Sequence, residues 1–243
     1  VAGACPGAAV SRLEDEAWQI RQAAAASLGQ LKAAEAIDAL VAALGDENSG
    51  VRSAAASALV QVGPASSQKL LPTLESDQPE VQAAAILALG DLRATAATDK
   101  LLELSKASEK IVRVAAIDAL GKIGDARAVE AMVAQVRAEA SRDRKKQDAK
   151  TYRLIFRALG RIEHPKTAEA LIALLNYKDR NAPRDPSIPE RALEALVELG
   201  PIATPPLGKA LKTSPEPAIR QGAAVALGRV VSPRTLELLI QAT

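Results

Sequence analysis

Hydrophobic residues recur along the chain at intervals that match the turn of an α-helix. In the segment from residue 51 to 62, Val51, Ala55, Ala58, Leu59 and Val62 occupy positions i, i+4, i+7, i+8 and i+11. Residues at this spacing lie along one side of a helix, and the positions between them are mostly small or polar. The pattern predicts an amphipathic helix, here called helix B.

The helix B pattern occurs seven times in all, which identifies the chain as an array of repeats. The copies begin at Ile20, Val51, Val81, Val112, Thr151, Ile188 and Ile219. A second stripe precedes helix B, as in Ile37, Leu40, Val41 and Leu44, and predicts another helix, helix A. A short helix pair with one apolar stripe on each helix cannot bury its surface alone. Neighbouring pairs must therefore stack and share one core.

The repeated motif reads apolar-Arg-x-Ala-Ala-x-x-Ala-Leu-Gly and resembles the short HEAT-like repeats of the phycobilin-lyase type. The resemblance extends from about residue 13 to the end of the chain. It implies an all-α fold, a right-handed α-solenoid or α-α superhelix of about seven HEAT-like helix pairs. We expect residues 1–12 to form an N-terminal tail or tether, and residues 13–243 to form one repeat domain with insertions near 139–150 and 178–187.

An arginine recurs near the start of helix B. It is found at Arg21, Arg52, Arg113 and Arg220, and one place later at Arg153. Such a ladder could bind an acidic partner, but it could also be structural, because HEAT-like families stack Asp and Arg residues at loops of this kind. Asp15 and Asp46 each precede their arginine by six residues. We favour the structural interpretation, in which the arginines satisfy helix ends.

Positive charge collects where the repeat spacing lengthens. Successive copies lie 31, 30, 31, 39, 37 and 31 residues apart, so both long intervals fall between Val112 and Ile188. Between residues 137 and 184 there are thirteen Lys or Arg against six Asp or Glu, a balance of +7, whereas the whole chain carries +2. Insertions in a regular array cost little stability and often serve function. The predicted contact residues for a partner are Arg142, Arg144, Lys145, Lys146, Lys150, Lys178, Arg180 and Arg184. The alternative is that the first insertion is only a solvated helical extension.

Composition argues against catalysis. The chain has one histidine, His164, and one cysteine, Cys5, so it lacks the Cys and His set of a structural zinc site. It has no Gly-rich phosphate loop ending in Gly-Lys-Ser/Thr. We predict no catalytic residues, no metal site and no cofactor. The basic segment has Tyr152, Phe156 and Tyr177 nearby but lacks an interleaved set of exposed rings, which disfavours nucleic acid as a partner because base stacking needs such rings.

The sequence thus favours a non-enzymatic scaffold or adaptor that binds a protein through the solenoid face and the basic loop edge. Two alternatives remain. The resemblance to phycobilin lyases implies a subunit that attaches a bilin chromophore, and the basic edge would also suit a nucleic-acid-binding HEAT-like protein.

The two ends of the chain carry further hypotheses. Ala2-Gly3-Ala4-Cys5 resembles the end of a bacterial lipoprotein signal, which predicts lipidation of Cys5 and a periplasm-facing location in the cell envelope. A cytoplasmic location is the alternative, and a membrane would be contacted only through that lipid. Trp18 is interpreted as an end-packing residue or a partner contact. Thr235 to Ile240 predicts a last helix A without a helix B, so we expect either that the native chain continues or that this uncapped end contacts another subunit.

Overall fold

The computed structural model describes residues 6–140, 149–177 and 187–230. All regular secondary structure in these ranges is helical. The chain divides into two compact units, Val1–Ile123 and Gly124–Thr243, and each is described here by itself.

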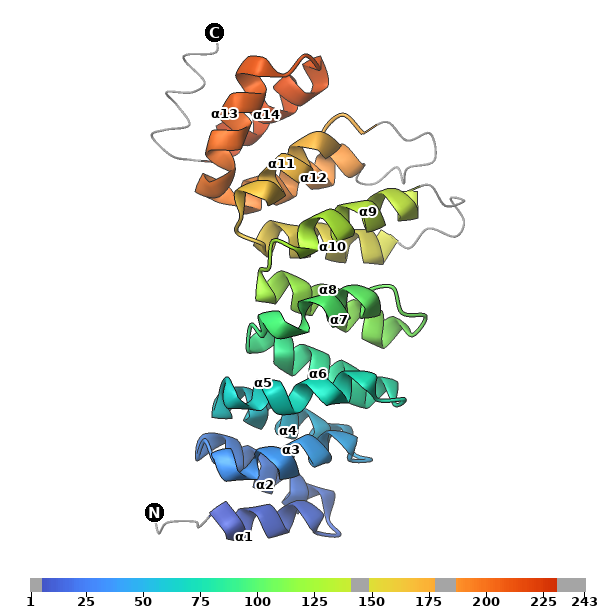
Figure 1. Ribbon diagram of the computed structural model, residues 1–243, viewed down its shortest axis with the longest axis vertical. Coiled ribbons are helices and arrows are strands. Elements are labelled where there is room, and N and C mark those ends of the chain that lie inside the picture. The colour runs from blue at the N-terminus through green and yellow to red at the C-terminus, as the bar shows by residue number, and fades with distance from the viewer. Residues whose placement is uncertain (1–5, 141–148, 178–186, 231–243) are drawn as a thin grey trace. The chain divides into compact units, whose positions relative to one another are not determined.

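The first unit contains four helix pairs, coloured from blue to green in Figure 1. The A helices are α1 (Pro6–Ser11), α3 (Ile37–Ala42), α5 (Ala65–Leu70) and α7 (Thr98–Leu104). The B helices are α2 (Trp18–Gln30), α4 (Ser49–Val62), α6 (Pro79–Asp91) and α8 (Lys110–Ile123). Short 3₁₀ turns such as Ala43–Gly45 and Leu71–Glu75 extend the A helices. Each B helix packs on the next, so the B helices form one layer and the A helices another.

The second unit contains three helix pairs, and its B helices likewise form one layer. The A helices are α9 (Ala128–Ala140), α11 (Pro165–Leu174) and α13 (Thr204–Thr213). The B helices are α10 (Ala149–Arg161), α12 (Ile188–Glu198) and α14 (Pro217–Arg229). All seven predicted starts of the repeat motif lie within B helices, which confirms the repeat prediction. The sequence ranges 141–148, 178–186 and 231–243 lie outside the described residues, and the predicted last helix A lies in the third of them.

Small side chains let the B helices of the first unit approach closely. Gly29 of α2 lies against Ala58 of α4, where a Cβ atom on the glycine would be 2.7 Å from the Ala58 Cα. Gly90 of α6 lies against Ala119 of α8 in the same way, at 2.8 Å. The leucine that precedes this glycine position is fully or almost fully buried in every repeat: Leu28, Leu59, Leu89, Leu120, Leu159, Leu196 and Leu227. Leucine and alanine therefore build a core that contains few rings.

The recurring arginines hold the loop that joins helix A to helix B. The Nη1 atom of Arg52 donates hydrogen bonds to the backbone carbonyls of Asp46, at 2.8 Å, and Glu47, at 2.9 Å. Arg21, Arg113 and Arg220 bond the carbonyls six and five residues before them in the same way. These bonds satisfy carbonyls after the last turn of helix A. The structural interpretation of these four arginines is confirmed.

One arginine of this set also connects neighbouring repeats. Arg21 Nε donates to Asp46 Oδ2 at 2.6 Å, and Arg21 Nη2 donates to Asp46 Oδ1 at 2.9 Å. The Asp46 Oδ1 atom also accepts the backbone N–H of Asn48 at 2.8 Å. The hydrogen bonds from Arg21 lower the pKa of Asp46 below its ordinary value, and burial opposes this shift. Asp46 thus joins the first and second repeats through a bidentate ion pair.

The N-terminal end of the array is partly exposed. Residues Pro6–Ser11, which the sequence suggested as part of a tail, form α1 and pack on α2. Trp18, the first residue of α2, is 42% exposed, and Ile20 is also 42% exposed. Val51, which occupies the position of Ile20 in the next repeat, is fully buried. The difference arises because α2 has no preceding B helix among the described residues.

Candidate functional site

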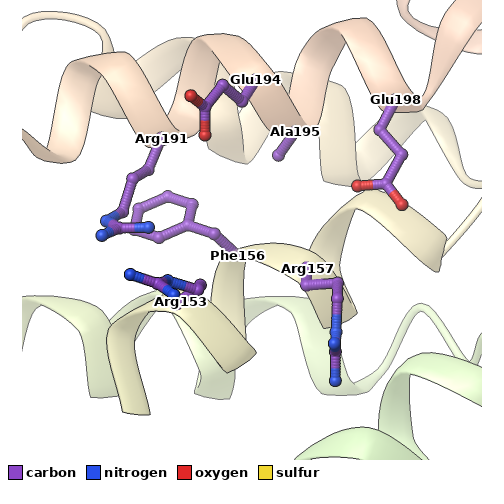
Figure 2. Close-up of a pocket in the computed structure, with 7 residues that line it drawn as sticks. All are labelled: Arg153, Phe156, Arg157, Arg191, Glu194, Ala195 and Glu198. Carbon is purple, nitrogen blue, oxygen red and sulfur yellow. The ribbon is translucent and has the colours of Figure 1, made fainter. Parts of the chain in front are cut away.

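A groove opens between α10 and α12, two neighbouring B helices of the second unit (Figure 2). Its volume is about 110 Å³. Its lining residues are Arg153, Phe156, Arg157, Arg191, Glu194, Ala195 and Glu198. Five of these seven side chains are charged, which makes the groove a candidate site for recognition of a charged partner.

The two walls of the groove carry opposite charge. Four exposed basic side chains of α10 form a stripe at helical spacing, here called the cationic stripe: Lys150, Arg153, Arg157 and Arg161. Three exposed glutamates of α12 form a second stripe at four-residue spacing, here called the acidic stripe: Glu190, Glu194 and Glu198. Residues spaced three or four apart lie on one side of a helix, so each stripe is continuous. Four residues of these stripes line the groove: Arg153 and Arg157 from α10, and Glu194 and Glu198 from α12.

The start of α12 is fixed by a capping box. The backbone N–H of Glu190 donates to Ser187 Oγ at 3.4 Å, and Glu190 Oε2 accepts the backbone N–H of Ser187 at 2.7 Å. The carboxylate of Glu190 accepts hydrogen bonds from the backbone N–H and the hydroxyl of Ser187, and these hold the pKa of Glu190 below its ordinary value. A capped first turn holds the helix start in place. Arg191, the next residue, lines the groove.

In other repeats a glycine of one B helix lies against an alanine of the next, but α10 and α12 lack this contact, and a groove lies between them. Gly160 of α10 corresponds in the repeat to Gly29 and Gly90, each of which lies against an alanine of the next B helix. Gly160 instead lies under the side chain of Glu198, and a Cβ atom there would be 2.7 Å from the Glu198 Oε2 atom. Ala195, the alanine at the corresponding position of α12, lines the groove.

Two guanidinium groups gather at one end of the groove, beside the ring of Phe156. Figure 2 shows Arg191 and Arg153 reaching this end from α12 and α10, Glu198 at the opposite end, and Arg157 directed away from α12. Arg191 is 6% exposed and Phe156 is 3% exposed, whereas Arg153 is exposed. No hydrogen bond or ion pair joins the exposed Arg153 side chain to the described residues. We call Arg153, Arg191 and Phe156 the cationic end.

The size of the groove restricts what it can hold. Small-molecule and cofactor sites commonly enclose about 300–1,000 Å³, and this groove has about 110 Å³. It has room for one side chain of a partner. The exposed Arg153 suits a carboxylate, because its planar guanidinium can donate two parallel hydrogen bonds.

Metal-binding and nucleophilic groups do not converge at this groove. Across the described ranges, no group of three or more His, Cys, Asp and Glu residues could hold a metal ion. His164 serves a local structural role, because its Nδ1 atom accepts the backbone N–H of Lys166 at 3.1 Å and caps α11. No helix in the described ranges is long and apolar enough to cross a membrane.

Of the residues predicted from sequence to contact a partner, the structure describes Lys150, which is exposed and lies on the cationic stripe of α10. The others lie outside the described residues: Arg142, Arg144, Lys145, Lys146, Lys178, Arg180 and Arg184. Cys5, the predicted lipidation site, also lies outside them.

Sequence reasoning missed the groove residues of α12. Arg191, Glu194 and Glu198 were not among the candidates. The four-residue spacing of the glutamates was a visible signal, but nothing in the sequence showed that α10 and α12 leave a groove between them.

Comparison with known proteins identifies the repeats. The family model described as HEAT repeats matches residues 8–72, 67–149 and 182–243, which together make up most of the chain. No curated protein sequence matches the chain.

Two solved structures illustrate the likeness in fold. The complex of CpcE and CpcF of phycocyanin lyase from a Nostoc species is similar with 22% sequence identity and a TM-score of 0.50, and the match covers 100% of this chain and 96% of that chain. Importin beta is similar with 16% identity and a TM-score of 0.50, and the match covers 93% of this chain and 35% of that chain. The predicted fold class, an all-α solenoid of HEAT-like helix pairs, is confirmed.

Proposed function

Because the chain belongs to the HEAT-repeat family, we propose that it is a non-enzymatic scaffold or adaptor whose B helices bind a protein partner. Stacked helical repeats present extended surfaces made of many neighbouring side chains, and such surfaces suit another macromolecule. Binding would rest on complementary shape and charge along α10 and α12, without a cofactor.

The groove between α10 and α12 is the observation that carries this proposal. It is too small for a typical cofactor and is lined mainly by charged side chains, which suits recognition of a protein surface. Its charges are arranged as stripes along two helices, so a partner segment could follow the groove over several turns. Opposite charges placed in register favour the correct partner and disfavour others.

The basic loop edge predicted from sequence would extend this contact. Lys150 begins the cationic stripe of α10, and Arg142, Arg144, Lys145 and Lys146 precede it directly in the sequence. Lys178, Arg180 and Arg184 precede α12 in the same way. We propose that these side chains steer an acidic surface toward the groove, since exposed charges act mainly on the rate of association.

Affinity purification with cross-linking tests the proposal. The full chain is used to capture partners, and cross-links are mapped by mass spectrometry. A specific partner should cross-link to α10, α12 or the preceding loops. Replacing Lys145 and Lys146 with Glu should reduce its capture, more strongly at low salt than at high salt.

A matched control separates a local contact from total charge. Replacing Lys209 and Lys212 of α13 with Glu changes the net charge equally on an exposed A helix. This control variant should capture the partner as well as the original chain does. Equal capture by both variants would contradict the role of the basic edge, and partners that cross-link only to A helices would contradict the proposal as a whole.

Attachment of a bilin chromophore is a second candidate function. It is supported by the resemblance of the repeats to those of phycobilin lyases and by the full-length likeness to the CpcE and CpcF complex. Coexpression with a bilin and a candidate apoprotein tests it. A covalent coloured adduct would support lyase activity, and its absence with several apoproteins would contradict it.

A further inference from the structure

We propose that copies of this chain bind one another head to tail, with helix α14 of one copy packed against helix α2 of the next. The inference goes beyond the proposed function, because it uses none of the residues that line the groove and its partner is a second copy of the chain. The contact would repeat the one that α2 makes with α4 inside the first unit.

One side of α2 has no neighbouring B helix among the described residues. Ile20, the first apolar residue of its motif, is 42% exposed. The corresponding residues of the other three repeats in the first unit are at most 9% exposed: Val51, Val81 and Val112. Trp18, two residues before Ile20, is also 42% exposed. A B helix placed on this side would cover Ile20 and Trp18, and burial of apolar surface favours association.

The loop before α2 presents a carboxylate in the same way as the loop before α4. Asp46, six residues before the arginine of its own repeat, accepts Nε and Nη2 of Arg21 from the preceding repeat. Asp15 occupies this place one repeat earlier. Its Oδ1 atom accepts the backbone N–H of Ala17 at 3.0 Å, just as Asp46 Oδ1 accepts that of Asn48 at 2.8 Å. Asp15 is therefore oriented to receive an arginine from a preceding B helix.

The surroundings of Asp15 also match those of the internal pair. Glu47 follows Asp46 and lies 3.4 Å from Nη2 of Arg21, and Glu16 follows Asp15 in the same way. Asp15 already pairs with Arg12, 3.2 Å from Nη1 to Oδ2, but the Arg12 side chain is 66% exposed. Such an exposed pair contributes little stability. A carboxylate has about four lone-pair positions, so Asp15 can accept a second arginine.

Arg220 of α14 carries the matching donors. Its Nη1 atom donates to the carbonyls of Ser214, at 2.8 Å, and Pro215, at 3.0 Å, as Nη1 of Arg21 does in its own loop. The Nε and Nη2 atoms of Arg21 cross to Asp46 of the next repeat. Those of Arg220 have no hydrogen-bond partner within the ranges that the structure describes. Arg220 is thus placed to bind the carboxylate of a following repeat.

Small residues complete the match between the two ends. Gly29 of α2 lies against Ala58 of α4. Gly228 holds the place of Gly29 in α14; it is exposed, and an added Cβ atom would meet no described atom within 4 Å beyond its own helix and chain neighbours. Ser27 holds the place of Ala58 in α2 and is exposed as well. Its hydroxyl donates to the carbonyl of Ala23 at 2.8 Å, so Ser27 can be covered without losing a hydrogen bond.

Charge favours this contact over a symmetric one. In the head-to-tail arrangement, Arg220 meets Asp15 and Glu16. In a symmetric contact between two α2 helices, the two acidic loops would face like charges, which opposes association. A head-to-tail contact joins two different surfaces, so each associated pair still has one open α2 and one open α14, and further copies can add.

Sedimentation velocity of the full chain, over about a hundredfold range of concentration, tests the inference. The mean sedimentation coefficient should rise with concentration. Ile20→Glu and Gly228→Gln should each abolish this rise, because each blocks one of the two surfaces. Ile111→Glu, the same change at a 49% exposed position of α8, should associate as the original chain does. A chain that stays monomeric at every concentration would overturn the inference.

Mixing the two blocked variants gives the sharpest result. The Ile20→Glu copy keeps an intact α14, and the Gly228→Gln copy keeps an intact α2, so the mixture should form dimers and no larger species. Circular dichroism checks that both variants are folded. If folded variants stay monomeric when mixed, or if Gly228→Gln alone associates normally, the contact is not head to tail and the inference fails.

A pair of arginine variants tests the proposed ion pair. Arg220→Ala should weaken association about tenfold. Arg52→Ala removes the same kind of bonds to loop carbonyls, but Ser76 stands where its acidic partner would be, so association should be unchanged. Equal effects of the two variants would overturn the proposed register. Capture of a protein partner at α10 and α12 tests the proposed function separately, because these substitutions leave the groove residues intact.

Discussion

Replacing Gly90 with Ala tests whether the close packing of B helices stabilises the array. Gly90 lies inside α6, where alanine would normally favour the helix by about 1 kcal/mol. The added Cβ atom would lie 2.8 Å from the Cα and 2.9 Å from the Cβ of Ala119 in α8. Because both are atoms that no side-chain rotation can move, the two helices themselves must separate.

The size of the effect follows from these distances. Carbon atoms pack best at about 3.5–4.0 Å, so α6 and α8 must move apart by up to about 1 Å. Excess volume in a packed core typically costs about 1–3 kcal/mol, and a gap of this size also weakens contacts along the rest of the interface. After the gain in helix propensity of about 1 kcal/mol is subtracted, we expect Gly90→Ala to lower the free energy of unfolding by up to about 2 kcal/mol.

Urea denaturation followed by circular dichroism measures this change, and hydrogen exchange should locate the loss of protection in α6 and α8. Gly228→Ala in α14 is a matched control, because a Cβ atom added to Gly228 would have no atom of the described residues within 4 Å beyond its own helix and chain neighbours. It should leave stability unchanged or raise it by up to about 1 kcal/mol. If Gly90→Ala were as stable as the original chain, the argument from close approach would be refuted.

Three other substitutions test the fold and the site. Asp46→Asn should destabilise the chain by about 1 kcal/mol at pH 7 by weakening the pair with Arg21. Since folding lowers the pKa of Asp46, its stabilisation is present above the unfolded pKa of about 3.9 and is lost as pH falls through the lower folded value. The difference between the two chains in urea denaturation should therefore shrink at pH 2.5, and a constant difference would contradict the ion pair. Leu59→Ala, at a fully buried position, should cost about 2–5 kcal/mol in the same assay, and a loss below about 1 kcal/mol would contradict tight packing there. Ser187→Ala should cost about 1 kcal/mol and increase hydrogen exchange at the start of α12, and unchanged exchange would show that the capping box is unimportant.

The helix pairs could be predicted from sequence because the signal is local. Apolar residues at helical spacing, such as Val51, Ala55 and Leu59, mark the buried side of each B helix whatever its neighbours are. The first A helix was harder to recognise. Residues Pro6–Ser11 contain one large apolar residue, Val10, so they carry no stripe, and their helical state depends on packing against α2.

The groove could not be predicted, because it depends on how one repeat sits against the next. Gly160 has the same sequence context as Gly29, yet it lies under Glu198 instead of against an alanine. Arg153 was grouped with the recurring arginines although it lies one residue later in the motif. One residue turns a side chain by about 100° around a helix of 3.6 residues per turn, which directs Arg153 into the groove.

The central claim is that a protein partner binds the B helices at the groove between α10 and α12. Hydrogen exchange of the full chain, with and without its captured partner, tests this most directly. The account predicts added protection in α10 and α12, lost in Arg153→Glu, and no change in the exposed A helix α13. Protection confined to A helices, or none in α10 and α12, would contradict it.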